Sequence, residues 1–510
     1  MLKTFSALSI TSALLFSVPA LAEPTADNTV AVKAAFEFSS LDPTRRGYVF
    51  TRMQVLETLL NVDEKGNLQP ALATAWQIKE NGTVWEFDLR KGVRFHNGST
   101  MTAKDVANSL NIARTKPSLM QGAPITAVDP IGHNKLRVTL SSPYSPLGAI
   151  LANYSTAIMS EKAYDKAGNV VTLIGTGPFS AYEVVTPHKL VVERFDDYWG
   201  QKASIEYASY LTGHRAETRV LQARSGEGDI IFGLDPASVP TLKRLPHLNI
   251  LRSDLPRTLA VKLNLAHPLL AEQDNREALS LAINRTGIAA AVLRSKEAAT
   301  AQLLPSYMSN WHVKNTSVKQ DLDKAKSLLS AQGWTKNDEG WLEKAGQRFE
   351  LDLITYADRP ELVTVATAVQ DQWKRLGVKL NVSITSSSSI PAGHKDGSLE
   401  TALIARNFGT IADPLGIIVK DFGNADGGDW GSMNWSNPDI QQTLNTLVQE
   451  TDPAQYRQKA QQVAQAIYQE KPLIAIASYV QRTAINKRIE GFRFDPYERS
   501  YFLNELQWKK

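Results

Sequence analysis

Residues 85–98 read WEFDLRKGVRFHNG, and they say more about this chain than any other stretch. The first five alternate between apolar and polar side chains, which is typical of a half-buried β-strand. Gly92 ends the alternation, and Asn97-Gly98 predicts a second turn. Thr102 follows at the position of a helix N-cap, because its hydroxyl can accept a hydrogen bond from the first helical turn. The stretch therefore predicts a strand, a turn and a helix start.

A second region predicts a parallel α/β unit. We expect a strand over Leu351–Tyr356, a helix over Pro360–Leu376 that ends at Gly377, and a strand over Val378–Ile384. Two strands joined by a helix of this length are parallel in nearly all folds. Earlier in the chain, Val55–Asn61 has the apolar pattern of a helix. The fold class is therefore α/β.

Length, charge and cysteine content narrow the protein class. A chain of 510 residues exceeds what one hydrophobic core usually serves, so we expect two or three domains. The formal net charge is only +4, and the basic residues are scattered among acidic ones, so we expect no nucleic acid partner. There is no cysteine, which excludes disulfides, thiolate catalysis and thiolate metal sites.

The first 22 residues have the pattern of a cleavable export signal. Lys3 supplies the positive start, Ala7–Pro19 a short apolar core, and Ala20-Leu21-Ala22 the small-x-small cleavage pattern. The alternative is a buried N-terminal helix. A lipid anchor would need a cysteine directly after the signal. We therefore expect a freely diffusing protein of the Gram-negative periplasm, not lipid-anchored.

Eight short motifs occur in a fixed order, and together they resemble the large periplasmic solute-binding proteins of family 5, which serve oligopeptide, dipeptide and nickel-chelate ABC importers. The resemblance covers nearly the whole chain after the signal. The motifs are Leu41–Pro43, Trp85–Gly98, Gly175–Phe179, Tyr198–Gly200, Arg276–Leu279, Asp323–Leu329, Trp373–Val378 and Asp413-Pro414.

The resemblance implies a type II periplasmic binding protein fold, with two α/β lobes joined by hinge strands and an extra domain inserted in lobe one. Carried over to this numbering, lobe one comprises residues 23–48, 170–258 and 483–510. The inserted domain comprises 49–169, and lobe two comprises 259–482. We expect the chain to cross between the lobes near 256–260 and 480–486.

Sequence signatures of enzymes are missing. The eight histidines include no His-x-x-x-His or His-Glu-x-x-His spacing, and there is no Gly-x-Ser-x-Gly elbow or Gly-Lys-Ser/Thr phosphate loop. We therefore expect a binding protein with no catalytic residues, no cofactor and no metal held by the protein itself. An enzyme such as a periplasmic hydrolase of peptides or opines is the alternative of another class.

The first candidate binding residues lie where the strand-like run 403–407 enters an irregular loop. Ligands of α/β lobes bind beyond the carboxyl ends of strands, where Arg406, Asn407 and Phe408 should lie. Arg406 could hold a ligand carboxylate with two hydrogen bonds. The resemblance places Asp413 against a ligand's α-amino group. The alternative is that Asp413 begins a turn and Arg406 forms a surface ion pair.

Two further segments offer candidates in lobe two. Trp430 lies in the glycine-rich loop 427–435 and could form a flat wall of the binding site, whereas we expect Trp435 to be structural. Tyr356 and Arg359 lie at a strand-to-helix junction. They resemble the Tyr-x-x-Arg-Pro-Glu-Leu run of nickel-chelate and opine-chelate relatives; the alternative is capping and packing at the helix start.

In lobe one, Arg46 and Tyr48 follow the first motif, where the family has a loop of the binding site. Two departures from the nickel-binding pattern are visible. Ala405 stands where a metal-ligating histidine would be, and Asn153 where an arginine would be. A chelate whose organic carrier supplies every metal ligand is still compatible with these residues.

The function that the resemblance implies is capture of a small peptide or peptide-like solute by hinge closure and delivery to an inner-membrane ABC permease. The alternative ligand is a nickel or other metal chelate with an opine- or histidine-type metallophore. A lesser alternative is a chaperone-like binder. We expect the protein to be a monomer.

Overall fold

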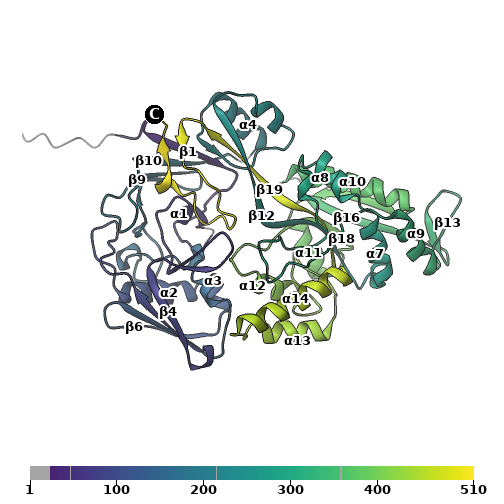
Figure 1. Cartoon of the computed structure of the whole chain (residues 1–510), viewed down its shortest axis with the longest axis horizontal. Coiled ribbons are helices and arrows are strands. Elements are labelled where there is room, and N and C mark those ends of the chain that lie inside the picture. Colours follow the sequence, from purple (N-terminus) through teal and green to yellow (C-terminus); the bar gives the residue numbers. More distant parts are fainter. Residues whose placement is uncertain (1–22, 46, 214, 357–358, 510) are drawn as a thin grey trace, which may run out of the picture.

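The computed structural model describes residues 23–45, 47–213, 215–356 and 359–509, and it shows two α/β lobes side by side (Figure 1). The expected export signal and Arg46 lie outside the described residues. Within those ranges, no helix combines the length and apolar character needed to cross a membrane.

A single ten-stranded sheet runs through both lobes. Five strands belong to lobe one, three to lobe two, and the two in the middle to both. In spatial order they are β17 (Lys379–Thr385), β16 (Glu350–Tyr356), β18 (Thr401–Asn407), β12 (Leu248–Leu263), β19 (Leu473–Asn486), β11 (Ile230–Ile231), β1 (Thr29–Ala34), β10 (Tyr207–Thr212), β9 (Lys189–Arg194) and β8 (Phe179–Val185).

The two shared strands form the connection between the lobes. β12 and β19 are antiparallel neighbours from Leu248 opposite Asn486 to Lys262 opposite Leu473, and they cross the centre of Figure 1. Their register shifts between Asp254 and Thr258. Such an irregularity bends a strand and interrupts its pairing. The crossovers expected near 256–260 and 480–486 are these two strands.

Lobe two contains the predicted strand–helix–strand unit. β16 and β17 pair in parallel, and α10 (Pro360–Leu376) connects them, as predicted. The helix ends at Gly377, which has the left-handed φ of 104° that a side chain would disfavour. The other helices of lobe two are α6 (Pro268–Ala271), α7 (Gln273–Leu281), α8 (Arg285–Ala291), α9 (Leu322–Ala331), α11 (Ser389–Asp396), α12 (Leu415–Phe422), α13 (Pro438–Leu447) and α14 (Pro453–Glu470).

The strand predicted at the start of residues 85–98 is β5 (Val84–Leu89). It is one of the two central strands of a separate four-stranded sheet. Its apolar residues point into the core, where Phe87 is 1% exposed. The predicted helix is α2 (Ala103–Arg114). Thr102 caps it in a reciprocal capping box with Asp105. The other strands of this sheet are β4 (Ala73–Lys79), β7 (Lys135–Leu140) and β6 (Ile125–Ile131).

The prediction of a helix over Val55–Asn61 is wrong. A one-turn helix, α1 (Tyr48–Arg52), lies before it, and Gln54 then adopts a positive φ of 57°, which ends helical geometry. The segment continues irregularly to β2 (Leu60–Val62). Glu57 explains the irregular path, because its carboxylate accepts hydrogen bonds from two distant motifs. Tertiary contacts have overridden a local apolar pattern.

The remaining elements are short. β3 (Leu68–Pro70) pairs with β2. A three-stranded sheet consists of β13 (Thr335–Lys336), β14 (Leu342–Lys344) and β15 (Gln347–Arg348), and a two-stranded sheet of β20 (Ile489–Glu490) and β21 (Gln507–Trp508). The remaining helices are α3 (Leu147–Ile150), α4 (Ala216–Ser225) and α5 (Val239–Leu242).

Candidate ligand-binding site between the lobes

A cavity of about 620 Å³ lies between the lobes, with β12 and β19 at its base. Side chains from both lobes line it, together with Asn153 and Tyr154 of the segment expected to form the inserted domain. The C-terminal segment 492–501 covers one side. A volume of this size suits a small organic ligand.

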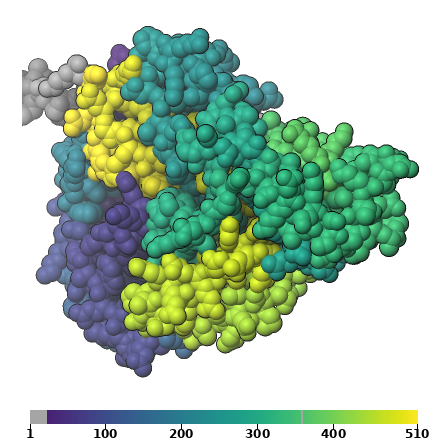
Figure 2. Space-filling view, turned by 45° about the vertical axis from the view of Figure 1, so that its right-hand side comes forward, coloured from purple at the N-terminus to yellow at the C-terminus, as the bar shows by residue number. Residues whose placement is uncertain are grey.

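Lobe two also contacts the segment expected to form the inserted domain. The backbone N–H of Ser145 donates to the carbonyl of Val448 at 2.8 Å, and Asn153 Nδ2 donates to the carbonyl of Thr410 at 2.8 Å. Figure 2 shows the yellow-green α13–α14 segment of lobe two lying against the purple and blue part of the chain. Asn153 and Thr410 both line the cavity, so this contact lies at its edge.

Arginine dominates the charged lining. Among the described residues that line the cavity, eight are arginines, four are acidic and none is lysine or histidine. The arginines are Arg52, Arg219, Arg257, Arg359, Arg406, Arg482, Arg493 and Arg499, and the acidic residues are Asp235, Glu361, Asp495 and Glu498.

Two of these arginines are neutralised from outside the cavity. Arg406 donates through Nε and Nη2 to both oxygens of Asp421 at 2.6 and 2.8 Å, and Arg493 pairs in the same way with Glu505. Apart from these two, the described lining still holds more arginines than acidic residues, so it carries an excess of positive charge. Buried excess charge of this kind is stabilised when a ligand of opposite charge binds.

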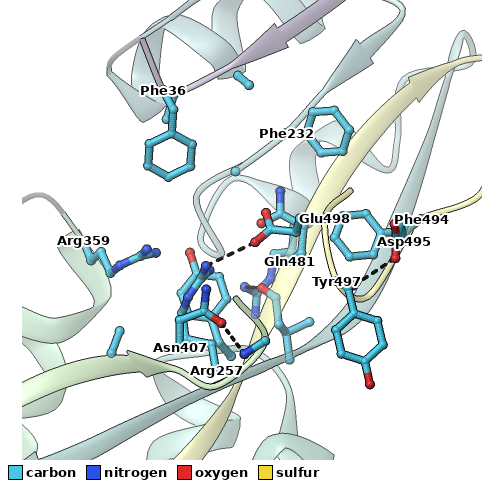
Figure 3. A pocket seen from close by; sticks show the side chains of 18 of the residues that line it. Phe36, Phe232, Arg257, Arg359, Asn407, Gln481, Phe494, Asp495, Tyr497 and Glu498 are labelled. Atoms are coloured by element: carbon cyan, nitrogen blue, oxygen red, sulfur yellow. Dashed lines mark hydrogen bonds and ion pairs between the residues drawn. The ribbon is translucent and has the colours of Figure 1, made fainter. Parts of the chain in front are cut away.

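The centre of this charge is a cluster around Glu498. Arg257 Nη2 donates to Glu498 Oε2 at 3.2 Å, and Arg52 Nη2 lies 3.8 Å from Oε1. Arg359 points toward them from lobe two (Figure 3). The ring of Tyr479 lies between Arg257 and Arg359, whose guanidinium carbons are 5.1 and 5.0 Å from its centroid. Cation–π contacts of this kind stabilise the guanidinium groups without neutralising them.

The pKa values of the cluster follow from burial and mutual repulsion. Burial would raise the pKa of Glu498, but Arg52, Arg257 and Arg359 hold it below its ordinary value. Burial lowers the pKa of Arg257; Glu498 opposes this shift, and Arg359 and Arg52 add to it by repulsion. Glu498 is therefore ionised, and the arginines around it repel one another.

Aromatic rings form the rest of the wall. Tyr356 and Trp430 meet edge to face with centroids 5.8 Å apart. Phe36 and Phe232 of lobe one face the space that Arg359 enters (Figure 3). Phe36 is 46% exposed and lines the cavity, so its ring is accessible to a ligand there.

The structure brings together six of the nine predicted binding residues in this cavity: Tyr48, Tyr356, Arg359, Arg406, Asn407 and Trp430. These residues differ in the hydrogen bonds that they already make within the protein. The guanidinium of Arg406 is occupied by Asp421, and Asn407 Oδ1 accepts from the backbone N–H of Gly409 at 2.9 Å. Tyr48 donates its hydroxyl to the carbonyl of Glu37 at 2.8 Å.

Asp413 and Phe408 do not line this cavity. Tyr456 donates its hydroxyl to both oxygens of Asp413 at 2.7 and 2.5 Å, and the N–H of Leu415 donates to Oδ1 at 2.9 Å. Phe408 is fully buried and lines a second cavity of only about 30 Å³ within lobe two. Asp413 thus holds the start of α12 against α14, an arrangement that its alternative role at a turn also predicts.

Trp435 is structural, as expected. It is 2% exposed, and its indole Nε1 donates to Glu470 Oε2 at 2.7 Å. The third predicted residue absent from the cavity description is Arg46, which lies outside the described residues.

Several lining residues carried no usable sequence signal. Arg257 lies within a strand, Arg52 at the end of a five-residue helix, and Glu498 in a C-terminal segment that offers only short strand-like pieces. Glu361 was visible in the Tyr356–Leu362 run but was not singled out. Its Oε1 is buried and has no hydrogen-bond partner among the residues that the structure describes, which marks it as another candidate contact for a ligand.

The donor set does not suit a metal held directly by the protein. Over the described part of the chain, no group of three or more histidine, cysteine, aspartate or glutamate residues is placed to hold a metal ion. Ala405 and Asn153, the two departures from the nickel-binding pattern, both line the cavity.

Comparisons with known proteins agree on one family. The nickel-binding protein NikA of Staphylococcus aureus is 26% identical over 445 residues, which are 86% of each protein. The dipeptide-binding protein of Escherichia coli is 24% identical over 470 residues, which are 85% of each. The crystal structure of NikA from Brucella suis in complex with Fe(III)-EDTA superposes with a TM-score of 0.84 at 21% identity, covering 94% of this chain and 100% of that one.

This likeness shows the two-lobed α/β fold of the periplasmic binding proteins. Residues 67–429 match the family described as bacterial extracellular solute-binding proteins, family 5 Middle. Because that match covers most of the chain, the protein belongs to the bacterial extracellular solute-binding proteins of family 5.

Proposed function

We propose that this protein is the substrate-binding component of an ABC importer, and that it captures a small peptide or peptide-like solute rich in carboxylates. The observation that carries the proposal is the cavity between the lobes, with its aromatic walls and its excess of arginine. Arginine recognises carboxylates with paired, charge-assisted hydrogen bonds.

Hinge closure about β12 and β19 is the proposed mechanism. Arg359, Tyr356, Asn407 and Trp430 belong to lobe two, whereas Tyr48 belongs to the start of α1 beside lobe one. A solute that contacts both sets binds the closed form more tightly than the open form and so shifts the equilibrium toward closure. The closed form would be the one presented to the inner-membrane permease.

The remaining parts of the proposal concern compartment and organisation. We place the protein in the periplasm, exported through a cleavable signal at 1–22 and, for lack of a cysteine, not lipid-anchored. We also propose that it is a monomer and that residues 49–169 form the inserted domain. Binding is its proposed activity, without catalysis.

A metal chelate is the second candidate solute. The observation in its favour is the same excess of positive charge, together with the scarcity of metal-ligating groups among the described residues. A carboxylate-rich metallophore would supply the metal ligands itself, and the arginines would bind its outer oxygens. Similar proteins from Staphylococcus aureus and Escherichia coli are named as nickel-binding.

Native mass spectrometry tests the proposal. The protein, purified from its own cell envelope without denaturation, should carry a co-purifying solute of a few hundred daltons that is released on unfolding. The isotope pattern of nickel or zinc in that mass would identify a chelate, and its absence a peptide-like solute. A protein that emerges empty and then hydrolyses a peptide panel would contradict the proposal.

A further inference from the structure

Two guanidinium groups from distant parts of the chain pair with the Glu498 carboxylate, and a third acts on it through its charge. Arg52 ends α1, Arg257 lies in β12, and Arg359 precedes α10. Glu498 faces all three from the C-terminal segment, and its charge acts on each of them. Among the described residues, no carboxylate lies within ion-pair distance of Arg359. Its closest described partners are the ring of Tyr479 and the hydroxyl of Tyr356, to which Arg359 donates a hydrogen bond.

Glu498 is held rigidly in this position. Arg52 Nε donates to the backbone carbonyl of Glu498 at 2.6 Å, so the same arginine binds the backbone and the side chain. Asp495 fixes the turn before it by accepting from the N–H groups of Tyr497 and Arg499 at 3.0 Å each. The Glu498 side chain remains 21% exposed, so a solute in the cavity can reach the cluster.

Resting on the proposed function, we propose that Glu498 determines the charge of the solute. It fills one anion position of the arginine cluster with a carboxylate of the protein itself, and the two positive charges left over select a solute with two net negative charges. Glu498 is thus a specificity-determining residue. A solute with one negative charge leaves a buried guanidinium without an anion. A solute with three negative charges brings one of them against the like charge of Glu498, which repels it.

A series of N-acetyl dipeptides of equal size provides the probes. Acetyl-Gln-Gln, acetyl-Glu-Gln and acetyl-Glu-Glu carry about one, two and three negative charges near pH 7.5. Isothermal titration calorimetry should show that the wild-type protein binds the dianion about tenfold more tightly than the monoanion, because one more guanidinium is paired.

Two substitutions should shift this preference in opposite directions. Glu498→Gln removes one negative charge, so the trianion should become the tightest ligand. Arg359→Gln removes one positive charge, so the monoanion should become the tightest ligand. Glu498→Asp keeps the charge and should keep the wild-type preference. Glu490→Gln changes the net charge equally at an exposed position, where Glu490 faces Lys509 at 3.8 Å, and should change nothing.

Equal affinity of the wild-type protein for all three probes, including no binding of any, would overturn the inference. So would an unchanged preference in Glu498→Gln. If Glu498→Gln does not fold, the opposite shift in Arg359→Gln decides alone. These outcomes leave the proposed function untouched, because a co-purifying solute found by mass spectrometry would still identify a binding protein.

Discussion

At the scale of single residues, the partner of a side chain decides its role more than its type does. Arg406 and Arg359 both line the cavity. Arg406 is bonded at two atoms to Asp421, which is fully buried, whereas the closest described partners of Arg359 are the ring of Tyr479 and the hydroxyl of Tyr356. A guanidinium already held by a buried carboxylate positions its loop, and one without a carboxylate can bind an anion.

Asp413 leads to a residue-scale prediction. Asp413→Ala should lower the free energy of unfolding by about 1–3 kcal/mol, because the buried hydroxyl of Tyr456 loses the carboxylate that accepts its hydrogen bond. Affinity for the solute should change less than twofold. Chemical denaturation measures the first quantity and calorimetry the second.

The double variant with Tyr456→Phe is the control. Removing the hydroxyl as well should recover part of the lost stability, since residue 456 then no longer buries a donor without an acceptor. A tenfold loss of affinity with unchanged stability would contradict this prediction and would return Asp413 to the role expected from the sequence.

At the scale of elements, three family motifs that are far apart in sequence meet around Glu57. Thr176 donates its hydroxyl to Glu57 at 2.8 Å, and Tyr198 and Trp199 donate at 2.9 Å each. His96 belongs to the Trp85–Gly98 motif, and its ring Nε2 lies 3.0 Å from the carbonyl oxygen of Gly177. A Cβ at Gly177 would collide with the backbone carbonyl of residue 54, so only glycine permits this approach. The three motifs therefore form one junction in the fold.

This junction should make stability depend on pH. Burial raises the pKa of Glu57 to about 7, despite three donors that lower it. The folded state therefore keeps a proton that the unfolded state releases near pH 4.5, and this contribution to stability is lost as the pH rises from about 4.5 to 7. The expected loss is on the order of 2 kcal/mol, measured by denaturant unfolding between pH 5 and 8.

Glu57→Gln is the matched control, since glutamine does not titrate. His96 has the opposite effect: burial lowers its pKa to about 4, so its contribution to stability rises with pH up to about 6.5. Because the variant retains His96, subtracting its pH profile from that of the wild type isolates Glu57. Parallel profiles would refute the assignment.

At the scale of the whole molecule, the two lobes share one sheet. β12 and β19 are hydrogen-bonded to strands of both lobes, so a change in the angle between the lobes must bend these strands. The register shift between Asp254 and Thr258 is the place with the weakest ladder. The cavity lies beside this register shift, so a ligand bound in the cavity should affect the angle between the lobes.

Small-angle X-ray scattering tests this coupling. The radius of gyration of the solute-free protein should decrease when the co-purified solute is added back. Arg359→Gln should weaken binding at least tenfold, about 1.4 kcal/mol, and reduce the decrease at equal solute concentration, because lobe two loses its charged contact.

The control for this experiment lies on the same helix. Arg375, near the other end of α10, is 64% exposed and pairs with Asp371 at 2.6 Å. Arg375→Gln removes the same charge far from the cavity and should behave as the wild type. Equal behaviour of the two variants would contradict a role for Arg359 in closure.

The local elements were largely predictable. α10 begins and ends where the sequence predicts, because Pro360 and Gly377 mark its two ends by backbone chemistry alone. The role of Thr102 as the N-cap of α2 was predictable for the same reason. The candidate site was predicted in lobe two, where residues follow strand ends, but Glu498 and Arg257 were missed because nothing local distinguishes them.

The sequence by itself determined the α/β class, the order of the elements and the family, since periodicity, caps and short motifs are properties of neighbouring residues. Only the tertiary structure decided which arginines face the cavity with excess charge and which are already paired. The physical reason is that ion pairing depends on distances between residues hundreds of positions apart, such as Arg52 and Glu498, and no local pattern encodes those distances.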